Sequence, residues 1–122
     1  MIKDFIEIIR LRLNGIKLID VDESVYDKFR KYVKGHKSDS DLTIKKYITR
    51  DWILSEDTSY EVMNHYPQPH IIETRQYGNL VIKCKKTEYE SRIISIYNRK
   101  GKKLDFNIDE ELKEKLNKIM RL

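Results

Sequence analysis

The sequence predicts an α+β fold for a single domain of residues 1–122. Short apolar runs rich in β-branched residues, separated by Pro and Gly, predict strands in the middle of the chain. Apolar residues that recur every three or four positions predict helices, most clearly near the C-terminus. The order of these patterns indicates an N-terminal β-hairpin and helix, a central ββα-like unit, and C-terminal strands followed by an amphipathic helix.

An Asn-Gly pair predicts that residues 9–18 form the N-terminal hairpin. Apolar and basic residues alternate before Asn14 and Gly15, and apolar residues recur at every second position after them. Asn-Gly between two alternating runs is the strongest short-range hairpin signal, because both turn positions need a positive φ. Residues 1–8 are ambiguous, since their apolar positions fit helical spacing.

A helix and another strand are expected between this hairpin and the central unit. Asp22 or Ser24 can cap the helix, and Gly35 is placed to end it. The apolar positions of residues 42–48 predict a strand.

The central unit lies within residues 63–92. Two strands are predicted at residues 71–72 and 80–84, and the polar residues that follow are compatible with a short helix. Alternation predicts a further strand at residues 92–98. Asn107 is a suitable N-cap for the last helix. The apolar stripe of that helix consists of Ile108, Leu112, Leu116 and Ile119.

Composition favours a cytoplasmic protein with a polyanionic partner. Charged residues make up 37% of the chain, the net charge is +5, and the isoelectric point is about 9.2. An excess of positive charge attracts nucleic acid. The single cysteine, Cys84, rules out an internal disulfide and fits a reducing compartment. No apolar run approaches about 18 residues, so we expect neither a membrane span nor a membrane partner.

The excess charge is concentrated in residues 83–103, which we call the basic tract. It holds eight basic and two acidic residues, and its charge of +6 exceeds the +5 of the whole chain. Tyr89 and Tyr97 lie among the charges, so the tract suits phosphate contact combined with base stacking. A solvated hairpin would give the same pattern. The candidate nucleic-acid-binding residues are Lys83, Lys85, Lys86, Arg92, Arg99, Lys100, Lys102 and Lys103.

Several short motifs, in a shared order, resemble the small HNH endonucleases of phages and introns. In the second half of the chain these motifs are Asn64-His65, Glu73-Thr74-Arg75, Asn79-Leu80 and a segment that ends in Glu88. Upstream, the family order is matched by Val21-Asp22 after an apolar hairpin and by residues 44–48. The resemblance therefore covers most of the chain, although each matching piece is short.

The resemblance implies metal-dependent cleavage of DNA. Such chemistry uses a base that deprotonates water and a metal that neutralises charge at the scissile phosphate. By resemblance, His65 is the base and Asn79 orients it, while Asn64 and Glu88 flank Mg²⁺ or Mn²⁺. Asn64 stands where the family usually has Asp, and Glu88 where Asn or His is usual, so catalysis is left open. A plainer interpretation makes His65 and His70 ordinary turn histidines.

Two other classes of function also fit the sequence. A compact basic domain with altered catalytic positions fits a small phage-type inhibitor, or anti-defence protein, that binds a host protein or nucleoprotein. The strand-rich second half, with Arg92, Tyr97 and Arg99, fits a RelE-like ribonuclease toxin that needs no metal. The first choice is a DNA-binding protein of the HNH-endonuclease type.

Overall fold

The computed structural model describes residues 2–64, 68–99 and 107–122. In these residues the chain has an α+β fold with four helices and one five-stranded sheet, which confirms the predicted fold class. The helices are α1 (Ile2–Leu13), α2 (Glu23–Tyr32), α3 (Asp41–Leu54) and α4 (Glu110–Met120). The strands are β1 (Asp20–Val21), β2 (Glu56–Met63), β3 (His70–Tyr77), β4 (Leu80–Lys86) and β5 (Ser91–Asn98).

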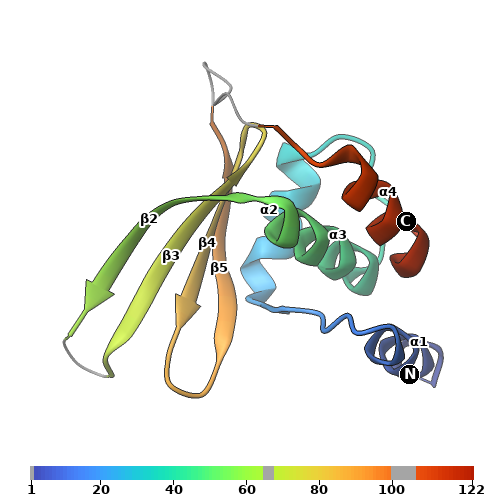
Figure 1. Cartoon of the computed structure of the whole chain (residues 1–122), viewed down its shortest axis with the longest axis horizontal. Coiled ribbons are helices and arrows are strands. Elements are labelled where there is room, and N and C mark those ends of the chain that lie inside the picture. The colour runs from blue at the N-terminus through green and yellow to red at the C-terminus, as the bar shows by residue number, and fades with distance from the viewer. Residues whose placement is uncertain (1, 65–67, 100–106) are drawn as a thin grey trace.

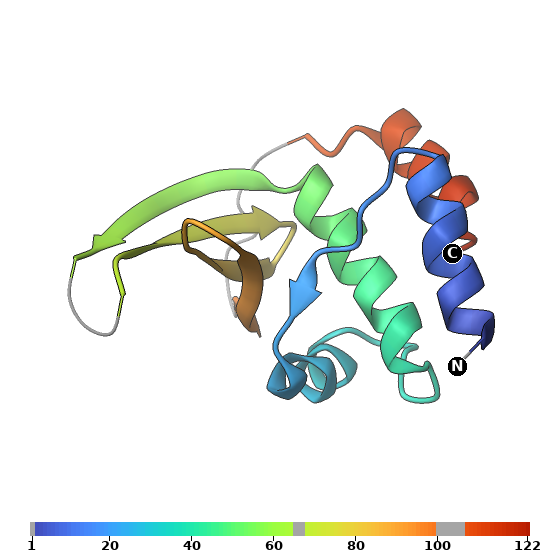
Figure 2. The ribbon, with the colours of Figure 1, turned by 90° about the horizontal axis from the view of Figure 1, so that it is seen from below.

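The sheet has the strand order β1-β5-β4-β3-β2. The short β1 runs parallel to β5, and the other neighbouring strands are antiparallel. The helices gather on one side of the sheet, while β2 and β3 reach away from them (Figure 1 and Figure 2). Gly78 has a φ of 60° and opens the two-residue turn between β3 and β4, as in a type II′ hairpin. The strands predicted at residues 71–72, 80–84 and 92–98 are confirmed.

The predicted N-terminal hairpin is wrong, because residues 2–13 form helix α1. Gly15 has a φ of 80° and lies just past the end of this helix. The Gly15 N–H donates to the Arg12 carbonyl at 3.0 Å, and the Ile16 N–H donates to the Leu11 carbonyl at 2.9 Å. This pair of bonds is the Schellman motif, in which glycine ends a helix. The Asn-Gly pair therefore stops a helix here and does not turn a hairpin.

The predicted helix after Asp22 is confirmed, and the strand predicted at residues 42–48 is wrong. The Asp22 carboxylate caps α2 by accepting a hydrogen bond from the Ser24 N–H. Residues 42–48 belong to α3, which is capped by the Ser40 hydroxyl. Ile44, Ile48 and Trp52 recur every four residues along α3 and are buried, so the helical period outweighs the short alternation.

The central ββα unit is also corrected, because a turn and a strand follow β4 where a helix was expected. The Thr87 N–H donates to the Glu90 carbonyl at 2.9 Å, which closes the turn. The Thr87 hydroxyl accepts hydrogen bonds from the N–H groups of Tyr89 and Glu90. β5 begins directly afterwards at Ser91, so Glu88 lies in a tight turn between two antiparallel strands.

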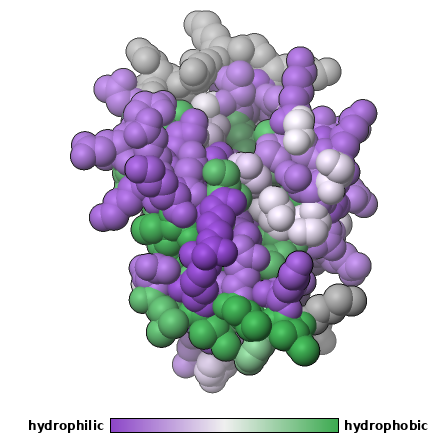
Figure 3. All heavy atoms as spheres, turned by 90° about the vertical axis from the view of Figure 1, so that its right-hand side faces the viewer, coloured by the Kyte–Doolittle hydropathy of each residue, from purple (hydrophilic) through white to green (hydrophobic). Residues whose placement is uncertain are grey.

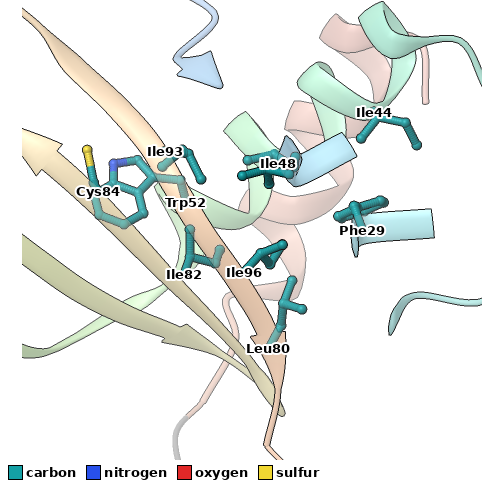
Figure 4. Close-up of a cluster of buried hydrophobic side chains, with 10 residues drawn as sticks. Phe29, Ile44, Ile48, Trp52, Leu80, Ile82, Cys84, Ile93 and Ile96 are labelled. Carbon is teal, nitrogen blue, oxygen red and sulfur yellow. The ribbon is translucent and has the colours of Figure 1, made fainter. Parts of the chain in front are cut away.

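The core lies between the helices and one face of the sheet. Its buried members come from α2, α3, β4 and β5 (Figure 4). They are Val25, Phe29, Ile44, Ile48, Trp52, Leu80, Ile82, Cys84, Ile93 and Ile96. The last helix, α4, packs against α3 and is capped by Asp109, two residues beyond the predicted Asn107.

Candidate functional site

The structure places the residues of the predicted nuclease site at both ends of the sheet. Asn79 lies in the turn between β3 and β4, whereas Glu88 lies in the turn between β4 and β5. β4 is seven residues long, so about 20 Å separates these turns at roughly 3.3 Å per residue. Asn64 is exposed just after β2, at the end of the sheet where Glu88 lies. His65 lies outside the described residues, and the structure does not bring Asn79 together with Glu88.

The surroundings of Glu88 do not assemble a metal site. Glu88 lines a hollow of about 480 Å³ together with Asp20 and Glu90. Within the described ranges, however, no three His, Cys, Asp or Glu side chains form a group that could hold a metal ion. Mg²⁺ needs several oxygen ligands in near-octahedral geometry. The described side chains do not fit this requirement, so Mg²⁺ or Mn²⁺ remains a prediction from the resemblance.

Three residues of the basic tract lie side by side on one face of the sheet. Lys83 and Lys85 are two residues apart on β4, so their side chains point to the same face. Arg92 on β5 is the register partner of Lys85. The intervening side chains of Ile82 and Cys84 belong to the core, so the basic side chains project from the opposite face. We call this surface, with Lys83, Lys85 and Arg92, the basic sheet face.

An exposed aromatic ring lies on the basic sheet face as well. Tyr97 of β5 is 40% exposed, and its neighbour Ile96 points into the core. Tyr97 therefore projects from the same face as Ser95, which is the register partner of Lys83. Cations and a ring are thus presented together on two adjacent strands.

Lys86 belongs to the other face of the sheet, where it forms an ion pair with the buried Glu73. The Glu73 carboxylate also accepts hydrogen bonds from Arg75 at 3.1 Å and from Tyr60 at 3.0 Å. Burial alone would raise the pKa of Glu73, but Lys86, Tyr60 and Arg75 contribute to lowering it to about 2. Lys86 is therefore held by its ion pair with Glu73 and is less available to a phosphate than Lys83 or Lys85.

The remaining part of the basic tract begins at the far end of β5. Arg99 is exposed, and its backbone N–H donates to the Asn79 carbonyl at 2.7 Å. Lys100, Lys102 and Lys103 lie outside the described residues. Arg92 and Tyr97 are about 16 Å apart along β5 at roughly 3.3 Å per residue. The ribonuclease hypothesis, which needs these groups at one phosphate, therefore gains no support from this geometry and remains a prediction.

A cleft that the sequence did not predict lies beside Asn79. It has a volume of about 400 Å³ and lies between α2, α3, α4 and the turn that joins β3 to β4. Its polar lining includes Lys34, His36, Arg50, Asp51, Asn79 and Lys113.

Asp51 is the most perturbed group of this cleft. Its side chain is buried, and the Arg50 guanidinium donates to its Oδ1 at 2.8 Å and 2.9 Å. Burial raises the pKa of Asp51 to about 6, although Arg50 and Lys113 act to lower it. A carboxyl group that titrates near neutrality in a cleft is a candidate acid or base. The Arg50 guanidinium also donates to Asn117 at 2.8 Å. Arg50 therefore links α3 to α4 as well as contacting Asp51.

A second basic surface surrounds the end of α2. A hollow of about 390 Å³ is lined there by Arg30, Lys31, Lys34, Gly35, Lys37 and Ser38. Arg30 is held by Asp27 and Asp41. The sequence signal was present, since lysines recur at every third position over residues 28–37. Residues 28–37 hold five basic and no acidic side chains, so their charge density exceeds that of the basic tract, which carries +6 over 21 residues.

No helix in the described parts of the chain is long and apolar enough to cross a membrane. Comparisons with protein-family models, curated proteins and solved structures find no match. The resemblance to HNH endonucleases therefore rests on the short motifs alone, and the function is argued from the surfaces described above.

Proposed function

We propose that this chain binds nucleic acid, DNA first of all, through the basic sheet face. The observation that supports the proposal is the row of Lys83, Lys85 and Arg92 on the face opposite the core. No described carboxylate forms an ion pair with Lys83 or Lys85, and Arg92 has a partly exposed pair with Glu90 at 3.7 Å. Exposed pairs contribute little, so these three cations are available to phosphates.

The arrangement suits an extended nucleic-acid backbone. Side chains on one face of a strand are spaced by about 6.6 Å, and adjacent strands lie about 4.8 Å apart. A rigid sheet therefore holds Lys83, Lys85 and Arg92 in a short row without an entropic cost for ordering a loop. Tyr97 lies on the same face, where its ring can stack on an unpaired base. The face is thus best matched to a strand whose bases are accessible.

The geometry supports binding more than cleavage. Asn79 and Glu88 lie at opposite ends of β4, so the described residues do not form one catalytic centre. Metal-dependent cleavage is tested by nicking of plasmid DNA with Mg²⁺ or Mn²⁺. Activity that is lost in His65→Ala would support it, and activity unaffected by that change would remove His65 from the mechanism.

The proposal is tested with a triple variant of the basic sheet face. Lys83→Ala, Lys85→Ala and Arg92→Ala together remove three cations from one surface. Lys115→Ala, Lys118→Ala and Arg121→Ala form the matched control, since these exposed residues of α4 and its C-terminal end carry the same charge. Binding to labelled single-stranded DNA, double-stranded DNA and RNA is then measured as a function of salt concentration.

We expect the sheet-face variant to lose affinity and the control to keep most of it. Each phosphate contact contributes about −0.9 to the slope of log affinity against log salt, so the slope should flatten by up to about three units. Equal losses in both triple variants would mean that net charge alone drives binding. Unchanged binding in the sheet-face variant would remove this face from the function and direct attention to the lysines around the end of α2.

A further inference from the structure

Helix α1 presents an apolar stripe to the outside of the molecule. Five large apolar side chains of this helix are between 42% and 84% exposed, and they are Ile2, Phe5, Ile6, Ile9 and Leu13. They recur at helical intervals, so they form one continuous stripe along the helix. A hydrophobic band runs along the lower edge of the face on which α1 lies (Figure 3).

The helix is attached to the rest of the molecule by the side opposite the stripe, through polar contacts and the buried Leu11. Glu7 forms an ion pair with Lys46 of α3, and Arg10 donates to the Ile119 carbonyl of α4 at 2.7 Å. Leu11 is the one buried residue of the helix. An amphipathic surface helix usually turns its apolar stripe toward the core. Here the orientation is reversed, and such exposed apolar surfaces mark interaction sites.

The borders of the stripe are basic. At about 100° per residue, the exposed Arg12 lies roughly 20° around the helix from Phe5 on one border, and the exposed Lys3 lies roughly 60° from Ile6 on the other. Arg10 is on the same side as Lys3 but is occupied by its hydrogen bond to Ile119. Asp4 lies about 100° or more from every residue of the stripe. An apolar stripe with basic borders is complementary to a surface that has an apolar interior beneath an anionic outer layer.

The docking of α1 limits the shape of its partner. One side of α1 is held against α3 and α4, so a partner can contact only the other side. A flat surface can make such a one-sided contact, whereas a groove that encloses the helix cannot. A second copy would bring no acidic side chain to the borders of the stripe, because Asp4 and Glu7 lie about 100° or more around the helix from it. A bilayer is flat, accepts an apolar helix face to a depth of about 5–10 Å, and can supply anionic headgroups to the borders.

We propose that α1 binds the surface of a membrane that contains anionic phospholipids. The apolar stripe enters the acyl boundary, and the basic borders contact the phosphates of the headgroups. This interaction is independent of nucleic-acid binding and uses another part of the molecule. It differs from the sequence prediction of no membrane partner, which considered spanning segments and not a short helix that lies in the membrane surface.

The test is flotation of the full chain with vesicles. Wild type should float with vesicles of phosphatidylcholine and phosphatidylglycerol, and it should not float with phosphatidylcholine alone. The double variant Phe5→Ser with Ile9→Ser keeps every charge and should bind at least tenfold more weakly. A control variant, Val62→Ser with Tyr89→Ser, removes two similarly exposed apolar side chains elsewhere and should bind like wild type. Far-UV circular dichroism should show that all variants are folded.

Insertion is measured separately from attraction by charge. Phe5→Trp adds a second tryptophan, whose emission is obtained by subtracting the Trp52 signal of wild type. On vesicle binding this emission should shift to the blue and be quenched by brominated lipids. Absence of vesicle binding, or binding that survives Phe5→Ser with Ile9→Ser, would overturn the proposal. Binding that is lost in the triple variant of the basic sheet face alone would do the same. If wild type binds no vesicles but forms a dimer, and the dimer dissociates in Phe5→Ser with Ile9→Ser, then the partner of the stripe is a second copy of this chain.

Discussion

Two buried carboxyl groups respond in opposite ways to their surroundings. Glu73 is surrounded by Lys86, Arg75 and Tyr60, which overcome the effect of burial and hold its pKa at about 2. Asp51 has Arg50 as its ion-pair partner, and burial dominates, so its pKa is raised to about 6. Glu73 has more donors around its carboxylate than Asp51 has, and the balance between burial and these donors is opposite at the two sites.

The raised pKa of Asp51 predicts a pH-dependent stability. The folded protein holds the Asp51 proton up to about pH 6, whereas the unfolded chain releases it near pH 4, so stability falls as pH rises between these values. Asp51→Asn does not titrate and should avoid this loss. Relative to wild type, its free energy of unfolding should increase by up to about 3 kcal/mol between pH 4 and pH 7.5. Urea unfolding at both pH values measures this difference.

The control for this prediction is Asp4→Asn, which changes an exposed aspartate. This variant shows how the loss of one exposed carboxyl group changes the free energy of unfolding at the two pH values, and the change for Asp51→Asn between them should be larger. A constant offset for Asp51→Asn would mean that this carboxyl group titrates normally in the folded protein and is no candidate acid or base.

At the scale of elements, the end of α1 shows why a strong local signal was misread. The Asn-Gly pair satisfies both a hairpin turn and a helix stop, because both need glycine at a positive φ. What decides between them is the helical spacing that begins before residue 9 and continues to Leu13. Strand β4 and helix α2 had no such competing signal and were predicted correctly.

Gly15 should therefore behave as a helix-ending residue. Its φ of 80° is strained for a residue with a Cβ, while no atom lies within 4 Å of where that Cβ would stand. Gly15→Ala should lower the free energy of unfolding by about 1 kcal/mol, from backbone strain alone. Gly15→Asn should cost less, because Asn tolerates this conformation. Chemical unfolding of the three proteins gives the order, and equal costs for Ala and Asn would contradict it.

At the scale of the whole molecule, the candidate site could be predicted in part. The charge of the basic tract is visible in the sequence, and a short apolar run in β4 and alternation along β5 are enough to predict strands there. Lys83 and Lys86 lie on opposite faces of the sheet. Which of them faces the core depends on which alternate residues of β4 point inward. The cleft around Asp51 lies between three helices and a distant hairpin turn, and no local sequence pattern reports such contacts.

Some buried apolar residues belong to the main core and others lie on the outer helices α1 and α4, and α3 is tied to both sets. One side of α3 contributes Ile44, Ile48 and Trp52 to the main core. Other residues of α3 are tied to the outer helices, through Lys46 to Glu7 and through Arg50 to Asn117. Outside the main core lie the buried residues Leu11, Leu116 and Met120 of α1 and α4. Because α3 is tied to the main core and to the outer helices α1 and α4, we expect these two parts of the molecule to unfold together.

This coupling is tested by comparing two leucines of α1. Leu11 is fully buried and Leu13 is 84% exposed, so Leu11→Ala should cost about 2–4 kcal/mol and Leu13→Ala close to nothing. If unfolding is cooperative, Leu11→Ala should lower the midpoints seen by Trp52 fluorescence and by far-UV circular dichroism equally, although Trp52 lies in the main core. A fluorescence midpoint that stays at its wild-type value while the helical signal is lost earlier would show that α1 and α4 unfold as a separate unit.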